Sequence, residues 1–165
     1  MPYANTDSLA AADINNCLRG LKRDNTTYTV TGTTNETDLA SFTMTGGTMT
    51  ATGGIHILAA GTITGTAGTK RIRLYFGGTA IVDTTAATGS SDWFLEAWVY
   101  NTAANAQRIL GIWSDHQSAT NFNKDYTTLA IDTSANAVIK VTGTLGNSGD
   151  TITQALYDIY IAQIT

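Results

Sequence analysis

The chain has 165 residues, of which 42% are hydrophobic and only 13% are charged. The charged share is about half that of an average globular protein, and threonine, glycine, alanine and asparagine fill the difference. Such a composition, with a single proline, is typical of an all-β protein with many turns. The net charge of −4 argues against a nucleic-acid-binding protein, which needs a basic face. The length fits one domain with its own core.

Cysteine content and the first residues predict the cellular context. Cys17 is the only cysteine, so no intrachain disulfide is expected. Residues Met1–Ala10 lack the basic start and apolar run of a secretory signal. No stretch reaches the length of a membrane-spanning helix. We therefore expect a soluble protein that is made in the cytoplasm and has no membrane partner.

Residues Thr6–Arg23 carry a helical pattern. Apolar residues recur at spacings of three and four, at Ala10, Ile14, Cys17, Leu18 and Leu21. The pattern stops at Asp24–Thr27, so we predict a helical arm over residues 1–25 and a β domain over 26–165. The arm is interpreted as an attachment element whose anchors are Leu9, Ile14, Leu18 and Leu21. The alternative, that the helix packs on its own domain, remains open.

The rest of the chain reads as short strands separated by glycine-rich and polar turns, as in a sandwich or barrel. Eight to ten antiparallel strands are expected. The candidate segments are Thr27–Thr34, Thr37–Met44, Gly54–Ile63, Arg71–Phe76, Thr79–Thr84, Trp93–Tyr100, Arg108–Trp113, Tyr126–Asp132, Val138–Thr142 and Thr151–Ile164. Outside the N-terminal region, Lys70, Arg71 and Arg73 form the one dense basic cluster, which is interpreted as a solvated strand face.

The segment Asp92–His116 holds all three tryptophans and is predicted to form a hairpin, with Asn101–Gln107 as a long loop. Its first strand is apolar on both faces. One face carries Trp93, Leu95, Ala97 and Val99, and the other carries Phe94, Trp98 and Tyr100. A strand with one wet face would alternate cleanly, so the second face is expected to be covered by a loop or another subunit.

The last predicted strand, Thr151–Ile164, is also apolar on both faces. Strict alternation places Ile152, Leu156, Tyr160 and Ile164 on one face and Tyr157, Ile159 and Ile161 on the other. Two such strands would leave a large apolar patch on a monomer. We therefore predict a closed homo-oligomer. Its expected interface residues are Phe94, Trp98, Tyr100, Leu156, Tyr157, Ile159 and Ile161. Coverage within one chain is the alternative.

No recognisable catalytic or metal-binding motif is present. Asp115 and His116 are adjacent, but no nucleophile motif accompanies them. The spacing of His116, Asp115 and Asp125 matches no known metal frame. His56 lies among isoleucines and leucine and reads as a core or interface histidine. We therefore expect no enzyme activity, no cofactor and no bound metal.

Three stretches carry a family resemblance. They are Thr34–Thr79, NTAANAQRI after the tryptophan strand, and GDTITQALYDIYI at Gly149–Ile161. The shared features are Glu36-Thr37 before a strand, Lys70–Arg73 leading to Phe76-Gly77-Gly78, and Asp150–Thr153 opening the last strand. In these features the chain resembles small structural proteins of tailed bacteriophages. The resemblance implies a single jelly-roll β-sandwich, often trimeric like the tumour necrosis factor fold.

The resemblance also implies a role in the virion. The leading expectation is a non-enzymatic capsid decoration or cement protein that binds the major capsid protein as a homotrimer. The chain is too short for a fibre shaft or a tail spike with a catalytic domain. The alternative is a receptor- or carbohydrate-binding module at a tail or fibre tip. All three tryptophans are expected on strands rather than in binding loops, which favours the first role.

Overall fold

The computed structural model describes residues 20–84, 89–115 and 122–163, which hold eleven β-strands and no helix. The strands are β1 (Gly20–Asp24), β2 (Tyr28–Thr31), β3 (Thr37–Met44), β4 (Gly54–Thr64), β5 (Lys70–Phe76), β6 (Thr79–Asp83), β7 (Ser91–Ala103), β8 (Ala106–Asp115), β9 (Phe122–Leu129), β10 (Ala137–Leu145) and β11 (Thr151–Gln163). The predicted all-β class is confirmed, with one strand more than expected. A helix able to cross a membrane does not occur in these ranges.

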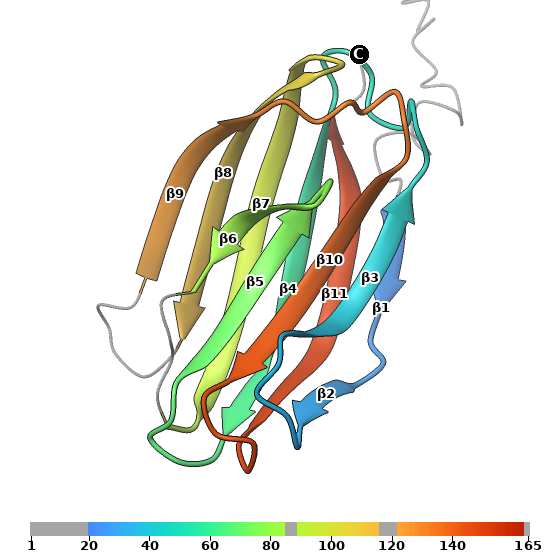
Figure 1. Cartoon of the computed structure of the whole chain (residues 1–165). Coiled ribbons are helices and arrows are strands. Elements are labelled where there is room, and N and C mark those ends of the chain that lie inside the picture. The colour runs from blue at the N-terminus through green and yellow to red at the C-terminus, as the bar shows by residue number, and fades with distance from the viewer. Residues whose placement is uncertain (1–19, 85–88, 116–121, 164–165) are drawn as a thin grey trace, which may run out of the picture.

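The strands form two antiparallel sheets that pack face to face (Figure 1). The larger, seven-stranded sheet has the order β1-β11-β4-β7-β8-β9, and β2 also pairs with β11. The smaller sheet has the order β3-β10-β5-β6. β8 and β9 form the end of the larger sheet beyond β7, which we call the β8–β9 wing. β6 of the smaller sheet still packs on β8, and β9 lies beyond it.

The core lies between the two sheets and follows the period-two pattern of the sequence. On β7 the inward side chains are the predicted set Trp93, Leu95, Ala97 and Val99, and all four are buried. Opposite them, β5 and β10 contribute a second set of buried apolar residues, Ile72, Leu74, Phe76, Ile139 and Val141. The indole nitrogen of Trp93 donates a hydrogen bond to the carbonyl of Thr153 at 3.1 Å, so this polar group has a partner within the fold.

The predicted helix over Thr6–Arg23 is wrong at its C-terminal end. Gly20–Asp24 is strand β1, where Lys22 pairs with Ile159 and Arg23 with Asp158. Leu21 packs against the core instead of serving as an external anchor. Backbone pairing with β11 overrides a helix preference that is weak in so short a segment. The rest of the predicted helix, with Leu9, Ile14 and Leu18, lies outside the described residues.

The tryptophan hairpin is confirmed, but its predicted long loop is not. β7 and β8 pair as far as Ala103 opposite Ala106, so the turn is tight. Asn101 and Gln107 are buried strand residues that face each other, and Gln107 Nε2 donates to Asn101 Oδ1 at 3.0 Å. Their remaining amide groups bind Thr50 O, Thr133 Oγ1 and Ile131. Polar residues that read as a loop therefore form a buried hydrogen-bond network.

A register shift in β11 explains why strict alternation misassigned its faces. The pairing with β4 jumps from Gln154 to Leu156, which marks a β-bulge. Before the bulge Ile152 faces the core, and after it Tyr157 and Ile159 face the core. Leu156 and Tyr160 point to the outer face instead. One extra residue thus moves every later side chain of the strand to the opposite face from the one predicted.

Candidate functional site

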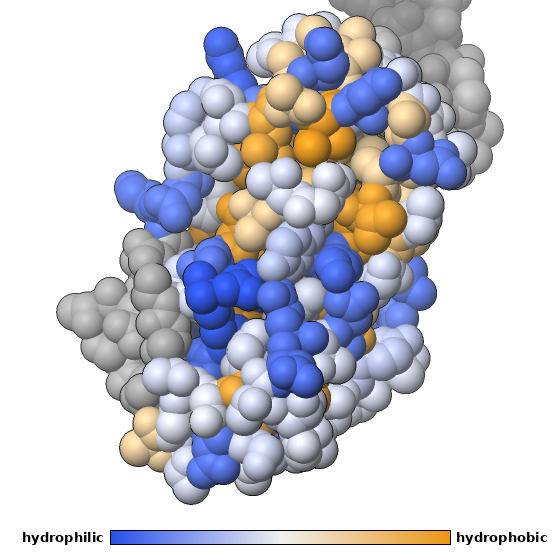
Figure 2. Space-filling view, in the orientation of Figure 1, coloured by the Kyte–Doolittle hydropathy of each residue, from blue (hydrophilic) through white to orange (hydrophobic). Residues whose placement is uncertain are grey.

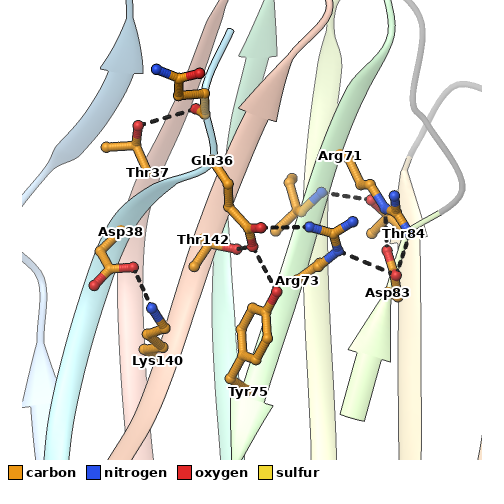
Figure 3. A network of polar contacts seen from close by, with 12 residues as sticks. Glu36, Thr37, Asp38, Arg71, Arg73, Tyr75, Asp83, Thr84, Lys140 and Thr142 are labelled. Carbon is orange, nitrogen blue, oxygen red and sulfur yellow. Dashed lines mark hydrogen bonds and ion pairs between the residues drawn. The ribbon is translucent and has the colours of Figure 1, made fainter. Parts of the chain in front are cut away.

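Charged side chains that neutralise one another lie on the outer face of the four-stranded sheet (Figure 3). Apolar surface is also visible on this side of the molecule (Figure 2), and Val138 is 41% exposed there. Glu36 accepts hydrogen bonds from Arg73 at 2.7 Å, Tyr75 at 2.8 Å and Thr142 at 2.6 Å. Arg73 also binds Asp83 at 3.2 Å, and Arg71 binds the same carboxylate. Lys140 pairs with Asp38 at 2.8 Å. Because every charge in this network has a partner, this face is suited to contact with water.

Two carboxyl groups of this network, Glu36 and Asp83, have pKa values below their ordinary range. Partial burial acts to raise the pKa of Glu36, but hydrogen bonds from Thr142, Tyr75 and Arg73 outweigh it and lower the pKa. The pKa of Asp83 is lowered for the same reason, because Arg71 and Arg73 outweigh its burial. A carboxyl group with a lowered folded-state pKa stabilises the fold above its unfolded-state pKa, and this contribution disappears as the pH falls through the folded-state pKa.

Replacing Glu36 with glutamine should therefore make the protein less sensitive to acid. The urea midpoint of the wild type should fall between about pH 5 and pH 2, as Glu36 and Asp83 take up protons. In Glu36→Gln that fall should be smaller, because Glu36 no longer titrates while the other carboxyl groups with a lowered pKa, such as Asp83 and Asp150, still do. Urea unfolding at neutral and acidic pH measures the difference. An equal fall in both proteins would contradict a stabilising role for the ionised Glu36.

The outer face of the seven-stranded sheet is different, because rings and apolar side chains cross it in register. The aromatic row runs over five neighbouring strands as Tyr160, His56, Trp98, Leu110 and Tyr126, each paired with the next. Tyr126 is 66% exposed and Leu110 39%. The adjacent rows add Leu58 and Ile112 on one side, with Phe94 and Leu156 beyond them.

Ring stacking and an acid–imidazole contact order the middle of this row. The His56 ring stacks on Trp98 with centroids 4.6 Å apart and lies 6.2 Å from Tyr160. His56 Nε2 is 2.5 Å from Glu96 Oε1. Beside them, Tyr160 donates to Asp158 at 2.5 Å, and Arg23 donates to the Tyr160 hydroxyl at 3.2 Å. We call the part of this face on β11, β4 and β7 the central face, defined by Leu156, Tyr160, His56, Leu58, Phe94 and Trp98.

A shallow depression of about 360 Å³ adjoins the central face on β7, β8 and β9. We call it the aromatic depression. Its lining comprises Trp98, Tyr100, Arg108, Ile109, Leu110, Ile112 and Tyr126. An open hollow with several rings and one cation can bind a flat apolar surface that also carries hydrogen-bonding groups.

The structure separates the predicted interface residues into two groups. Phe94, Trp98 and Tyr100 lie on the outer face of β7 and are half-buried, and Leu156 is exposed on β11. Tyr157 and Ile159 are buried in the core, where the Tyr157 hydroxyl donates to Ile139 O at 2.9 Å. Burial raises the pKa of Tyr157. Ile161 follows them on the inward side, paired with Ile55. The core residues are thus covered within one chain.

Within the described residues, no cluster of three or more metal-ligating side chains occurs. His116 lies outside those residues, while Asp115 is buried at the end of β8. The prediction for Lys70 is also wrong, because the sequence analysis placed its side chain on a solvated face with Arg71 and Arg73. It is fully buried and forms an ion pair with Asp150 at 2.9 Å.

Tyr160, Leu110 and Tyr126 were not predicted as site residues, and His56 was interpreted only as a core or interface histidine. Their side chains become neighbours only when β11, β4, β7, β8 and β9 pair in register. One local signal of an apolar outer face was present in the sequence of β8. Ile109 and Trp113 point to the core, so alternation places the apolar residues Leu110 and Ile112 on the outer face together with Arg108.

Comparisons with known proteins give little guidance for this chain. No model of a protein family matches the sequence, and no curated protein is similar to it. One solved structure that aligns with it is the CBM2 module of the evolved Dit of Lactobacillus casei BL23 phage J-1, at 10% identity. The alignment covers 76% of this chain and 70% of the other with a TM-score of 0.41. A likeness at this level identifies neither a family nor a function.

Proposed function

We propose that this chain is a non-enzymatic structural protein of a tailed-phage virion that assembles as a homotrimer through its central face. The observation that carries the proposal is the contrast between the two outer faces. The smaller sheet presents ion pairs that need no partner, such as Arg73–Glu36 and Lys140–Asp38. The larger sheet presents rings and leucines that remain partly exposed. A second copy of the chain is the occupant that would remove this apolar surface from water.

A polar group on the same face also supports a protein partner. Asp158 is buried, and its Oδ1 has no hydrogen-bond partner among the described residues. Its other oxygen binds Tyr160 and lies 3.8 Å from Arg23. A buried acceptor without a donor is costly, so a donor from a neighbouring copy would stabilise the assembly.

The proposed fold is a jelly roll, as the resemblance to phage structural proteins implies. If β2, β3, β4, β5, β6, β7, β10 and β11 are numbered one to eight, the sheets read 1-8-3-6 and 2-7-4-5. This order corresponds to two Greek keys wound together. The β8–β9 hairpin is then an insertion between the sixth and seventh strands. The resemblance also sets the expected number of subunits at three.

Sedimentation of the full-length chain tests the proposal. We expect a trimer at micromolar concentration that co-sediments with particles assembled from the major capsid protein of the same phage. Binding of the trimer to capsids would support a decoration role with residues Leu9, Ile14 and Leu18 as the attachment segment. A monomer at these concentrations would overturn the proposed assembly. A trimer that does not bind capsids would exclude a decoration role, and the protein would then belong to another part of the virion.

The aromatic depression favours a second candidate, a receptor- or carbohydrate-binding module. The rings of Trp98, Tyr100 and Tyr126 line it together with the Arg108 side chain. Sugar rings pack their C–H faces on aromatic rings, and their hydroxyls accept hydrogen bonds from a guanidinium. The sequence placed the tryptophans on strands and counted this against binding. The structure shows that a strand residue such as Trp98 lies on an accessible outer face.

A further inference from the structure

Six of the eight basic side chains in the described part of the chain form ion pairs. Lys22, Arg23, Lys70, Arg71, Arg73 and Lys140 each lie within 4.0 Å of a carboxylate. Among the residues that the structure describes, Arg108 and Lys124 are the two basic residues for which no such pair is found. Both belong to the β8–β9 wing of the larger sheet. In a protein of net charge −4, two uncompensated cations on one small surface require an explanation.

These two cations flank the aromatic depression. Arg108 is part of its lining and pairs across the strands with Thr128 and Tyr100. Lys124 pairs with Ile112, another lining residue, on the opposite side of the Leu110–Tyr126 pair. Both side chains are exposed. Glu96, the nearest carboxylate in the same cross-strand row, is already in contact with His56 at 2.5 Å.

We propose that the aromatic depression binds an acidic saccharide, with Tyr126 stacking on a sugar ring and Arg108 and Lys124 binding the carboxylates. This inference rests on the carbohydrate-binding candidate and adds the charge class of the ligand. Arg108 can form a bidentate contact with a carboxylate, and Lys124 supplies a second positive charge. The high exposure of Tyr126 leaves one ring face free for a ligand.

The test compares acidic sugars with their neutral parents. Isothermal titration of the full-length protein uses sialyllactose against lactose, and trigalacturonate against its methyl ester. We expect at least one acidic sugar to bind about tenfold more tightly than its neutral partner, since a charged hydrogen bond is worth about this factor. The double variant Arg108→Gln with Lys124→Gln should remove this preference, so that each acidic sugar and its neutral partner bind with equal affinity. Tyr126→Ala should weaken both.

Lys140→Gln is the matched control, because it removes one positive charge from the opposite sheet. The single variant Arg108→Gln removes the same number of charges from the depression. If Lys140→Gln lowers acidic-sugar affinity as much as Arg108→Gln does, the preference reflects overall charge and the proposal is wrong. Equal affinity for acidic and neutral sugars would also overturn it, while leaving the carbohydrate-binding candidate intact. Absence of binding to all four sugars would overturn both. The oligomeric state of each variant, measured by sedimentation, should equal that of the wild type.

Discussion

Replacing Lys70 with methionine is expected to lower the melting temperature by about 10 °C, because it breaks a fully buried ion pair. Lys70 Nζ lies 2.9 Å from Asp150 Oδ2 and donates to the carbonyls of Thr66 at 2.6 Å and Gly68 at 3.0 Å. Neither side chain of the pair is exposed. Methionine keeps most of the volume but leaves the carboxylate and both carbonyls without the ammonium group.

The other oxygen of Asp150 shows how this cluster fixes a loop. Oδ1 accepts hydrogen bonds from Thr66 N at 2.7 Å and from Thr66 Oγ1 at 2.9 Å. The hydrogen bonds from Lys70 and from the Thr66 backbone lower the pKa of Asp150. The pair therefore ties the loop between β4 and β5 to the start of β11.

Lys140→Met is the control for the Lys70 variant. It also removes a lysine from an ion pair, but its partner Asp38 is exposed to water. A surface pair contributes little, so this variant should melt within about 2 °C of the wild type. Differential scanning calorimetry measures both. Equal, small effects of the two substitutions would show that the Lys70–Asp150 pair does not stabilise the fold.

The second large effect concerns two residues of β11 that the sequence treated alike. Ile159→Asp should unfold the chain, because Ile159 is fully buried and an unpaired carboxylate in the core costs more than about 4 kcal/mol. Leu156→Asp should leave the fold intact, because Leu156 is 37% exposed on the central face. In the proposed trimer, however, the new carboxylate would lie in the interface. Circular dichroism should report loss of strand signal only for Ile159→Asp, and sedimentation should report a folded monomer for Leu156→Asp.

Val138→Asp provides a matched control for Leu156→Asp. Val138 is 41% exposed but belongs to β10 of the smaller sheet, on the opposite side of the sandwich. This variant should remain a trimer. If Leu156→Asp also remains a trimer, the central face is not the subunit interface. If Ile159→Asp folds, the assignment of the bulge in β11 is wrong.

Local pattern was sufficient for the strands with a simple register. In KRIRLYF, strict alternation places Ile72, Leu74 and Phe76 together on one face, and all three are buried. The same rule worked for Trp93–Val99 on β7. It failed on β11, because a bulge at Ala155 is a property of pairing with β4 and has no unique sequence signature. The helical prediction failed at Gly20–Asp24, because this segment pairs as a strand with residues of β11 that lie more than a hundred positions away.

The sequence by itself determined the all-β class, the positions of most strands and the core face of the tryptophan strand. These features depend on composition and on a period of two, which neighbouring residues carry. The tertiary structure alone decided the strand order, the burial of the Lys70–Asp150 pair, and the alignment of Tyr160, His56, Trp98, Leu110 and Tyr126 into one row. Those features require contacts between residues far apart in the chain. Such contacts arise from cross-strand register, which no local pattern specifies.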